Sequence, residues 1–111
     1  MKHALLSLLA LLAFIPAHAA STDADVCEHA TYFSGCGEAW GAVRAVTRVL
    51  LDRGCAEAVL SPLVDTAAME IRHCTRPQGI YDLPLAPVKS ACAEASALAF
   101  RDRALQACRA R

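Results

Sequence analysis

The six cysteines of this sequence are the side chains that could form a redox, haem or metal site, or disulfides, depending on their spacing. The six are Cys27, Cys36, Cys55, Cys74, Cys92 and Cys108. They form neither a C-x-x-C redox motif nor a C-x-x-C-H haem motif. Zinc sites usually have ligands two to four residues apart in each half, and only Cys27 with His29 and His73 with Cys74 come near that spacing. The pattern therefore predicts three structural disulfides, with no cofactor and no metal ligand.

The pairing of these cysteines is only partly predictable. A helix over 62–74 would hold Cys55 and Cys74 at opposite ends, and bridged Cα atoms must lie within about 7 Å. Cys92 and Cys108 on one helix would be about 24 Å apart. An up-down-up bundle favours Cys55–Cys108, and the other pairings stay open.

The remaining reactive side chains lack the partners that catalysis needs. His73 beside Cys74 resembles the histidine of secreted phospholipases, but the aspartate that should follow it is missing. Asp65 and Glu70 would point in different directions on their helix, and no Ser-His-Asp set has motif support. The sequence predicts that the protein is not an enzyme.

The first 19 residues are typical of a secretory signal peptide. Lys2 precedes an uncharged apolar run over 4–15, and Ala17 and Ala19 provide the small-x-small pattern of a cleavage site. The run is too short to span a bilayer, which takes about 20 residues. We predict cleavage after Ala19, export to an oxidising compartment and a single domain over 20–111. A retained N-terminal anchor is the alternative.

Composition narrows the class of protein further. The chain has 111 residues, 56% of them hydrophobic, with 11 basic and 11 acidic side chains. Its length allows one domain, and its neutral charge disfavours nucleic acid as a partner. A domain of this size is marginally stable without reinforcement, which disulfides would supply.

Helical periodicity predicts the elements that carry the cysteines. A first long helix, broken between Cys27 and Tyr32, ends at Gly54 in a left-handed cap. Three glycines lie within it. His29 lies on the apolar stripe of this helix and is predicted to be a core or boundary histidine. The stripe consists of Val26, His29, Phe33, Cys36, Trp40, Val43, Thr47, Leu50 and Leu51. The glycines are Gly35, Gly37 and Gly41.

Two further helices are predicted from proline positions. Ser61 would cap a second helix with Pro62 at its first position. Its buried stripe would be Leu63, Val64, Ala67, Ala68, Ile71 and Cys74, and its polar face Asp65, Thr66, Met69, Arg72 and His73. The segment over 75–87 is predicted to be irregular and to pack on the body through apolar side chains. Pro87 would begin a third helix. The tail after Phe100 would bend or cover another surface. The apolar anchors of the segment are Ile80, Tyr81, Leu83 and Leu85. The predicted fold is all-α, a small disulfide-stapled bundle of three to four helices.

Several short motifs occur in a suggestive order. They are Tyr32–Gly35 (YFSG), Cys55, Leu60–Asp65 (LSPLVD), Leu83–Ala86 (LPLA) and the Ala-rich stretch Ala91–Phe100 (ACAEASALAF). In this order and spacing the chain resembles the Rap/Tai family of type VI secretion immunity proteins. It departs from the family pattern in its larger number of cysteines, in the long loop and in the tail that carries Cys108.

The resemblance implies a small helical protein in the periplasm of a Gram-negative bacterium, with no membrane span after signal cleavage. It would bind and block a peptidoglycan-cleaving effector, a cell-wall hydrolase delivered by sister cells. Family members often act as dimers, so a homodimer is implied as well. The alternative function is a general envelope protein, such as a holdase chaperone or a small apolar-ligand carrier with an open groove.

An inhibitor benefits from a rigid surface, because a preordered surface loses less entropy on binding. Tyrosine and arginine are enriched among interface hot spots. The loop and the neighbouring helix therefore supply the partner-binding candidates Met69, His73, Arg76, Tyr81 and Asp82. Tyr81 has an alternative role as an anchor for its own loop.

Overall fold

The helices of this protein are those of a computed structural model that describes residues 23–31 and 33–110. They are α2 (Asp23–Cys27), α3 (Cys36–Asp52), α4 (Glu57–Cys74) and α5 (Asp82–Arg109), and the 3-10 turn η1 (Gly79–Tyr81) precedes α5. Within these residues all regular structure is helical, which confirms the predicted all-α fold. The predicted signal peptide over 1–19 lies outside the described residues.

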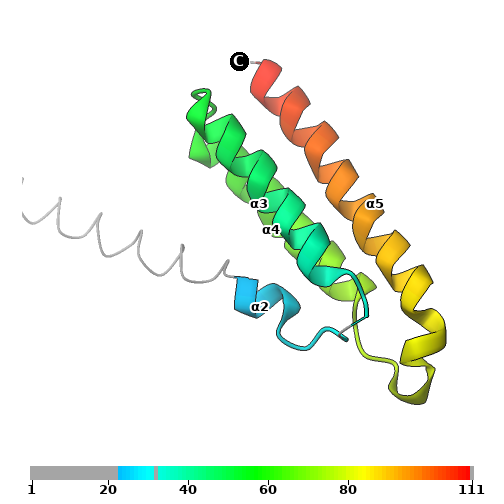
Figure 1. Cartoon of the computed structure of the whole chain (residues 1–111). Coiled ribbons are helices and arrows are strands. Elements are labelled where there is room, and N and C mark those ends of the chain that lie inside the picture. The colour runs from blue at the N-terminus through cyan, green and yellow to red at the C-terminus, as the bar shows by residue number, and fades with distance from the viewer. Residues whose placement is uncertain (1–22, 32, 111) are drawn as a thin grey trace, which may run out of the picture.

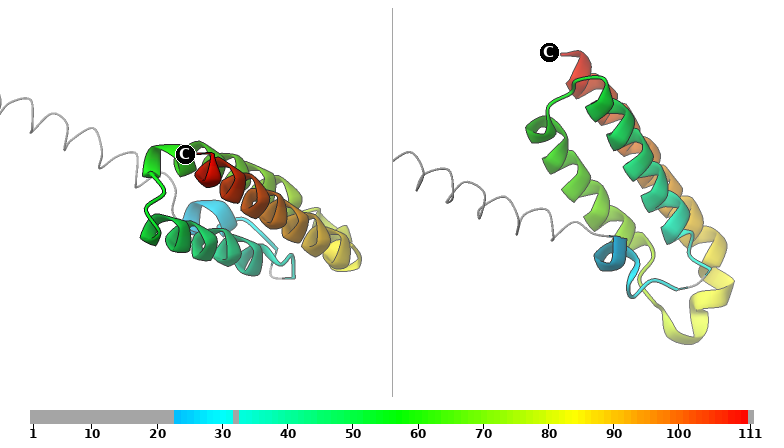
Figure 2. Two further views of the ribbon diagram at one scale, coloured as in Figure 1. Left: turned by 90° about the horizontal axis from the view of Figure 1, so that it is seen from above. Right: turned by 60° about the vertical axis from the view of Figure 1, so that its left-hand side comes forward.

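The three long helices form an up-down-up bundle (Figure 1). Helices α3 and α5 run in the same direction, and α4 is antiparallel to both. The α3–α4 turn and the C-terminal end of α5 therefore lie at one end of the bundle. We call this end the turn end, and the opposite end, which holds residues 75–88, the loop end. Helix α2 packs against α3 and α4 near the loop end (Figure 2).

The core is built from one face of each long helix. Trp40, Ile71 and Phe100 are its largest buried side chains from the three helices. Helix α5 contributes small residues at Ala93, Ala97 and Ala104, spaced so that they share one face. Because alanine has little bulk, α3 and α4 approach this face closely, and the larger side chains fill the space between them.

Three disulfides join the helices. Cys27–Cys36 ties α2 to α3, Cys55–Cys108 closes the turn end, and Cys74–Cys92 joins α4 to α5, with Cα–Cα distances of 5.8, 5.6 and 5.5 Å. The predicted Cys55–Cys108 pairing is confirmed. The other two pairings, which spacing left open, follow from the places where the helices lie side by side.

The predicted starts of the second and third helices are wrong. Helix α4 begins at Glu57, so Pro62 lies inside it and Ser61 is not its cap. Helix α5 begins at Asp82, so Pro87 lies inside it and the irregular segment is shorter than predicted. In both cases an acidic residue occupies the first turn, where the helix dipole favours it. A proline in the second turn breaks one backbone hydrogen bond, and the tertiary contacts of the bundle outweigh that loss.

Two further helix predictions need correction. Helix α3 begins at Cys36, and Gly35 is its N-cap with a φ of 76°, so Gly35 does not lie within the helix. Gly54 does adopt the predicted left-handed conformation, with a φ of 97°. Helix α5 continues without interruption through Phe100 to Arg109, so the predicted bend of the tail is wrong.

Most of the predicted apolar stripe of α3 is buried or half-buried, but three of its members are exposed. His29, Phe33 and Leu51 are exposed. His29 precedes α3 and lies beside Glu28, with 3.8 Å between His29 Nε2 and Glu28 Oε2. A single helical wheel placed His29 and Phe33 wrongly, because the chain leaves helical geometry between Cys27 and Cys36. The predicted polar face of α4 is exposed throughout. None of the described helices combines the length and apolarity that a membrane crossing requires.

Candidate partner-binding site

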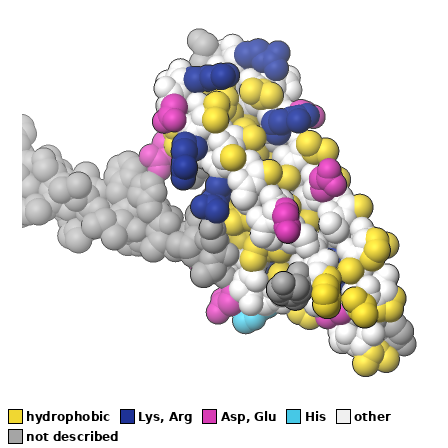
Figure 3. All heavy atoms as spheres, viewed as in Figure 1, with side chains coloured by type: hydrophobic (Ala, Val, Ile, Leu, Met, Phe, Trp, Pro, Cys, Tyr) yellow, Lys and Arg dark blue, Asp and Glu magenta, His cyan; other side chains and the backbone are white. Residues whose placement is uncertain are grey.

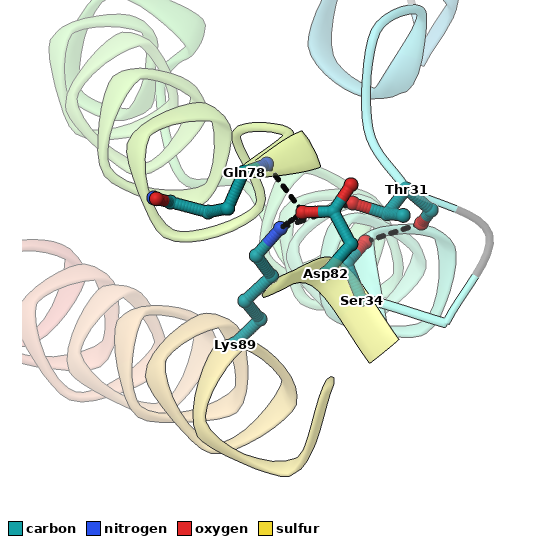
Figure 4. Close-up of polar contacts among 5 residues, drawn as sticks. All are labelled: Thr31, Ser34, Gln78, Asp82 and Lys89. Atoms are coloured by element: carbon teal, nitrogen blue, oxygen red, sulfur yellow. Dashed lines mark hydrogen bonds and ion pairs between the residues drawn. The ribbon is translucent and has the colours of Figure 1, made fainter. Parts of the chain in front are cut away.

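The loop end is organised around a buried lysine. Lys89, two turns into α5, is only 5% exposed. Its ammonium group lies 2.5 Å from the Asp82 carboxylate and 3.1 Å from Thr31 Oγ1 (Figure 4). The Gln78 backbone N–H donates to the same Asp82 oxygen. One side chain therefore holds together the α5 start, the loop before it and the segment that leads into α3.

The Thr31 segment is fixed from its own side as well. Ser34, which is fully buried, donates from Oγ to the Thr31 carbonyl oxygen at 2.8 Å. Gly35 then turns the chain into α3 in the left-handed conformation. A Cβ at Gly35 would lie 2.7 Å from Ser90 Oγ and 3.3 Å from Ser90 Cα. The close approach of α3 and α5 at this point therefore requires glycine.

The ion pair also shifts the titration of its carboxylate. The hydrogen bond from Lys89 lowers the pKa of Asp82, with smaller contributions in the same direction from the Gln78 amide, the Lys89 charge and Thr31, while desolvation opposes the shift. The ionised form is thus favoured in the folded protein. At neutral pH the Asp82 carboxylate is therefore the ionised acceptor of the Lys89 and Gln78 hydrogen bonds.

Large apolar side chains are exposed at the loop end, both in η1 and the first turns of α5 and in the segment that leads into α3. The exposed fractions are 53% for Phe33, 87% for Ile80, 64% for Leu83 and 65% for Val88. We call these four residues the loop-end patch. Hydrophobic side chains gather at this end of the visible face (Figure 3). Singly exposed apolar residues are normal on protein surfaces, but contiguous ones mark interaction sites.

The structure divides the candidates predicted from sequence. Met69, His73 and Arg76 are exposed. Met69 and His73 are four residues apart on one face of α4, and Arg76 follows the end of that helix. Asp82 is instead half-buried and paired with Lys89, an arrangement in which its carboxylate holds the loop, and its predicted contact with a partner stays a prediction. Tyr81 ends η1, and its side chain lies outside what the structure describes.

Sequence reasoning missed Lys89 and misplaced the loop anchors. Ile80 and Leu83 were predicted to pack on the body, but both are exposed and belong to the loop-end patch. The spacing of Asp82 and Lys89, two helical turns apart, was a signal that could have been found. It required the helix to begin at Asp82, and the prolines after it argued for a later start.

A groove of about 370 Å³ runs between α3 and α5. Small and apolar residues line its centre and charged residues flank it. Its main lining residues are Glu38, Ala42, Val46, Glu94, Leu98 and Arg101. A second hollow continues it toward the turn end and is lined by Val49, Arg53 and Leu105.

Within residues 23–31 and 33–110, no three histidine, cysteine or acidic side chains group in a way that could hold a metal ion. The only cysteines described are the six in disulfides. In comparisons with protein-family models, curated proteins and solved structures, nothing matches this chain. The candidate site is therefore defined by its own geometry, a rigid apolar end of a helical bundle.

Proposed function

We propose that this protein is an exported binding protein that neutralises a peptidoglycan-cleaving enzyme in the periplasm. In this proposal it inserts the loop-end patch into a concave surface of that enzyme. The observation that carries the proposal is the exposure of four large apolar side chains at one end of the bundle. A buried ion pair and a disulfide hold the segment of Ile80, Leu83 and Val88, and Lys89 also contacts Thr31 in the segment that carries Phe33. The resemblance to type VI secretion immunity proteins supplies the class of target.

Rigidity is the first support for this function. A flexible loop must lose conformational entropy when it binds, and that loss reduces affinity. Here Lys89 and Asp82 fix the loop from within, and the Cys74–Cys92 bridge fixes its two flanking helices. The apolar side chains are thereby presented in one arrangement before the partner arrives.

The chemistry of the exposed residues is the second support. The loop-end patch supplies apolar area, and the exposed His73 in the last turn of α4 and the exposed Arg76 after that helix supply polar groups at the same end of the bundle. An apolar centre with a polar rim is the usual anatomy of a protein interface. Disulfides persist in oxidising compartments such as the periplasm, which agrees with a target that acts on the cell wall.

The alternative function as an apolar-ligand carrier has weaker support. The carrier would use the α3–α5 groove, whose flanks carry Glu38, Glu94 and Arg101. These three residues and the central Leu98 are exposed to solvent, whereas a small-molecule site buries most of the surface of its ligand. Native mass spectrometry of the exported protein tests this alternative, since a carrier would retain a copurified lipid or other apolar ligand.

The test of the inhibitor proposal is a lysis assay. Peptidoglycan hydrolases, including any that is encoded beside this gene, are exported to the periplasm of a host with and without this protein. We expect one hydrolase whose lysis is suppressed by the wild type but not by the double variant Ile80→Asp with Leu83→Asp. Leu51→Asp, an exposed apolar position at the turn end, is the matched control and should still protect. Lysis by every hydrolase despite the wild-type protein would overturn the proposal.

A further inference from the structure

The α3–α5 groove is a second surface, separate from the loop-end patch. The close approach of Gly35 to Ser90 sets these two residues side by side near its loop end. Glu38 lies three residues after Gly35, and Glu94 lies four residues after Ser90. Because α3 and α5 run in the same direction with the same rise per residue, the two glutamates flank the groove at nearly the same level.

These two glutamates have no cationic partner in the part of the chain that the structure describes. Both are exposed and line the groove, and no ion pair within residues 23–31 and 33–110 includes either of them. Two carboxylates on the same groove repel each other, and a cation placed between them is attracted to both. The loop-end part of the groove is therefore suited to a basic side chain.

The arginines of the groove lie further along it. At 1.5 Å per residue, Arg101 is about 10 Å beyond Glu94, and Arg53 is about 22 Å beyond Glu38. Arg101 borders both the groove and the second hollow, which Arg53 also lines. Arg101 pairs with Asp102 on its own helix at 3.3 Å, but such exposed pairs contribute little. The surface is thus acidic near the loop end and basic from its middle to the turn end, where basic side chains gather in Figure 3.

The apolar floor between these charges has the dimensions of a helix-binding groove. Small residues line its loop-end half and larger ones its turn-end half. The small residues are Ala39, Ala42 and Ala97, and the larger ones are Val46, Val49 and Leu105. The groove and the second hollow together extend for about four helical turns. An apolar groove of this length commonly receives the apolar face of an amphipathic helix.

From this arrangement we infer that the α3–α5 groove binds an amphipathic helix of a partner protein, antiparallel to α3 and α5. Basic residues in the last turn of that helix contact Glu38 and Glu94, and acidic residues in its first turns contact Arg53 and Arg101. This charge order also agrees with the dipole of the bound helix itself, whereas a parallel helix would need the opposite, unfavourable order. The bound helix completes an up-down-up-down four-helix bundle.

The inference does not depend on the proposed function, because no member of the loop-end patch lines this groove. The probe is a synthetic peptide of about 18 residues with blocked ends, glutamates in its first turn, lysines in its last turn and a leucine stripe at helical spacing. It is titrated into the full chain with intact disulfides, and binding is followed by NMR. We expect saturable binding with a dissociation constant below about 1 mM. No saturation by the wild type at that concentration would overturn the inference.

Charge reversal tests the role of the two glutamates. Glu38→Lys with Glu94→Lys should raise the dissociation constant of the peptide at least about tenfold, because like charges then meet. A peptide with glutamates in place of its lysines should bind this variant more tightly than it binds the wild type. The control Glu28→Lys with Asp52→Lys changes the net charge equally outside the groove and should leave binding unchanged. Equal effects of the two double variants would contradict a specific site.

The floor and the orientation are tested separately. Ala42→Phe fills the floor and should weaken binding at least about tenfold, whereas Ala58→Phe, at an exposed position of α4 outside the groove, should have no effect. A spin label on the N-terminus of the peptide should broaden the amide signal of Gly54 at the turn end more than that of Gly37 at the start of α3. Stronger broadening at Gly37 would overturn the antiparallel arrangement.

A second copy of this chain is the other occupant that the experiment can detect. The wild type and Ala42→Phe are compared by sedimentation without peptide, and we expect both to have the same mass in solution. Self-association of the wild type that Ala42→Phe abolishes would assign the groove to a second copy and overturn the inference. Intact mass and circular dichroism verify that each variant keeps its three disulfides and its helices.

Discussion

The two ends of the bundle are closed in different ways. At the turn end, a short connection with left-handed Gly54 joins α3 to α4, and Cys55–Cys108 fixes it to α5. At the loop end, a longer connection joins α4 to α5, and the buried Lys89–Asp82 pair holds it in addition to Cys74–Cys92. The turn end exposes Val49 and Leu51 at 46% and 40%, whereas Ile80, Leu83 and Val88 at the loop end are 64–87% exposed.

The difference between the two ends concerns how each end is closed and which side chains it presents to solvent. A short turn with a disulfide is sufficient to close a helical bundle. The loop end has the same kind of closure and adds a desolvated ion pair, which by itself gives weak evidence of stabilisation. What the pair does achieve is a single arrangement of a segment whose apolar side chains face solvent, and that arrangement is what a binding surface needs.

Removing a disulfide should lower the free energy of unfolding more than the other changes do, and the loss should differ between the two ends. Cys55–Cys108 closes a 53-residue separation and Cys74–Cys92 an 18-residue one. The chain-entropy model then predicts losses of about 4 and about 3 kcal/mol in the free energy of unfolding when each pair is changed to serine. Urea unfolding measures both. A larger loss at Cys74–Cys92 would mean that strain or residual structure at the loop end dominates over loop length.

Two glycines at the start of α3 provide the next test. Gly35→Ala should lower the free energy of unfolding by at least about 1–2 kcal/mol, because its left-handed conformation disfavours a Cβ and Ser90 occupies the space. Gly37→Ala, whose Cβ would meet nothing within 4 Å, should instead raise stability by about 0.5–1 kcal/mol. Equal effects of the two substitutions in thermal unfolding would contradict the close approach of α3 and α5.

Local opening of the loop end should depend on Lys89. Lys89→Met keeps the apolar stem but removes the charge that contacts Asp82 and Thr31. Hydrogen exchange at the Gln78 amide should accelerate at least about tenfold, because its acceptor Asp82 is no longer held. Arg103→Met removes the exposed pair with Glu70 and should leave that exchange rate unchanged. Similar rates in both variants would show that the disulfide alone fixes the loop.

The pH dependence of the loop end follows from the lowered pKa of Asp82. A carboxylate with a depressed folded-state pKa contributes stability that is present above its unfolded pKa, about 3.9, and lost as pH falls through the folded value. The loop end should therefore stay closed from neutral pH to about pH 4 and loosen below it. The Gln78 amide chemical shift should titrate with a midpoint below the ordinary aspartate range, and Asp82→Asn should abolish that titration.

The loop-end patch should have the smallest effect on folding. Ile80→Ser and Leu83→Ser remove apolar groups that are already exposed, so the free energy of unfolding should change by no more than about 0.5 kcal/mol. Leu60→Ala, at a buried position, should cost about 2–5 kcal/mol in the same denaturation experiment. A loss at Ile80 comparable with that at Leu60 would show that the loop-end patch packs on the body and is not a surface for a partner.

Much of the fold was predictable because helical periodicity is a local property. The core stripe of α4, the polar face opposite it and the left-handed cap at Gly54 follow from residue types and their spacing. Helix starts were less predictable. Pro62 and Pro87 favoured late starts, yet each lies in the second turn of its helix, because packing along the whole helix outweighs one lost hydrogen bond.

The candidate site was less predictable than the fold. Met69 and His73 were located on the exposed face of their helix by spacing alone, and Arg76 was predicted in the loop. Asp82, predicted to contact a partner, is paired with the buried Lys89. Ile80 and Leu83, predicted to pack on the body, are exposed. Whether a loop side chain is buried depends on which helix covers it, and no local pattern contains that information.

The sequence by itself determined that this chain is helical and that its cysteines act as structural bridges, and it favoured the pairing of Cys55 with Cys108. These conclusions depend on local periodicity and on the length of a helix. The tertiary structure decided that Lys89 would be buried against Asp82, that the loop-end patch would face solvent and that side chains of α3 and α5 would line one groove. Each of these depends on helices that are distant in sequence and adjacent in space, and contacts of that kind arise only when the bundle packs.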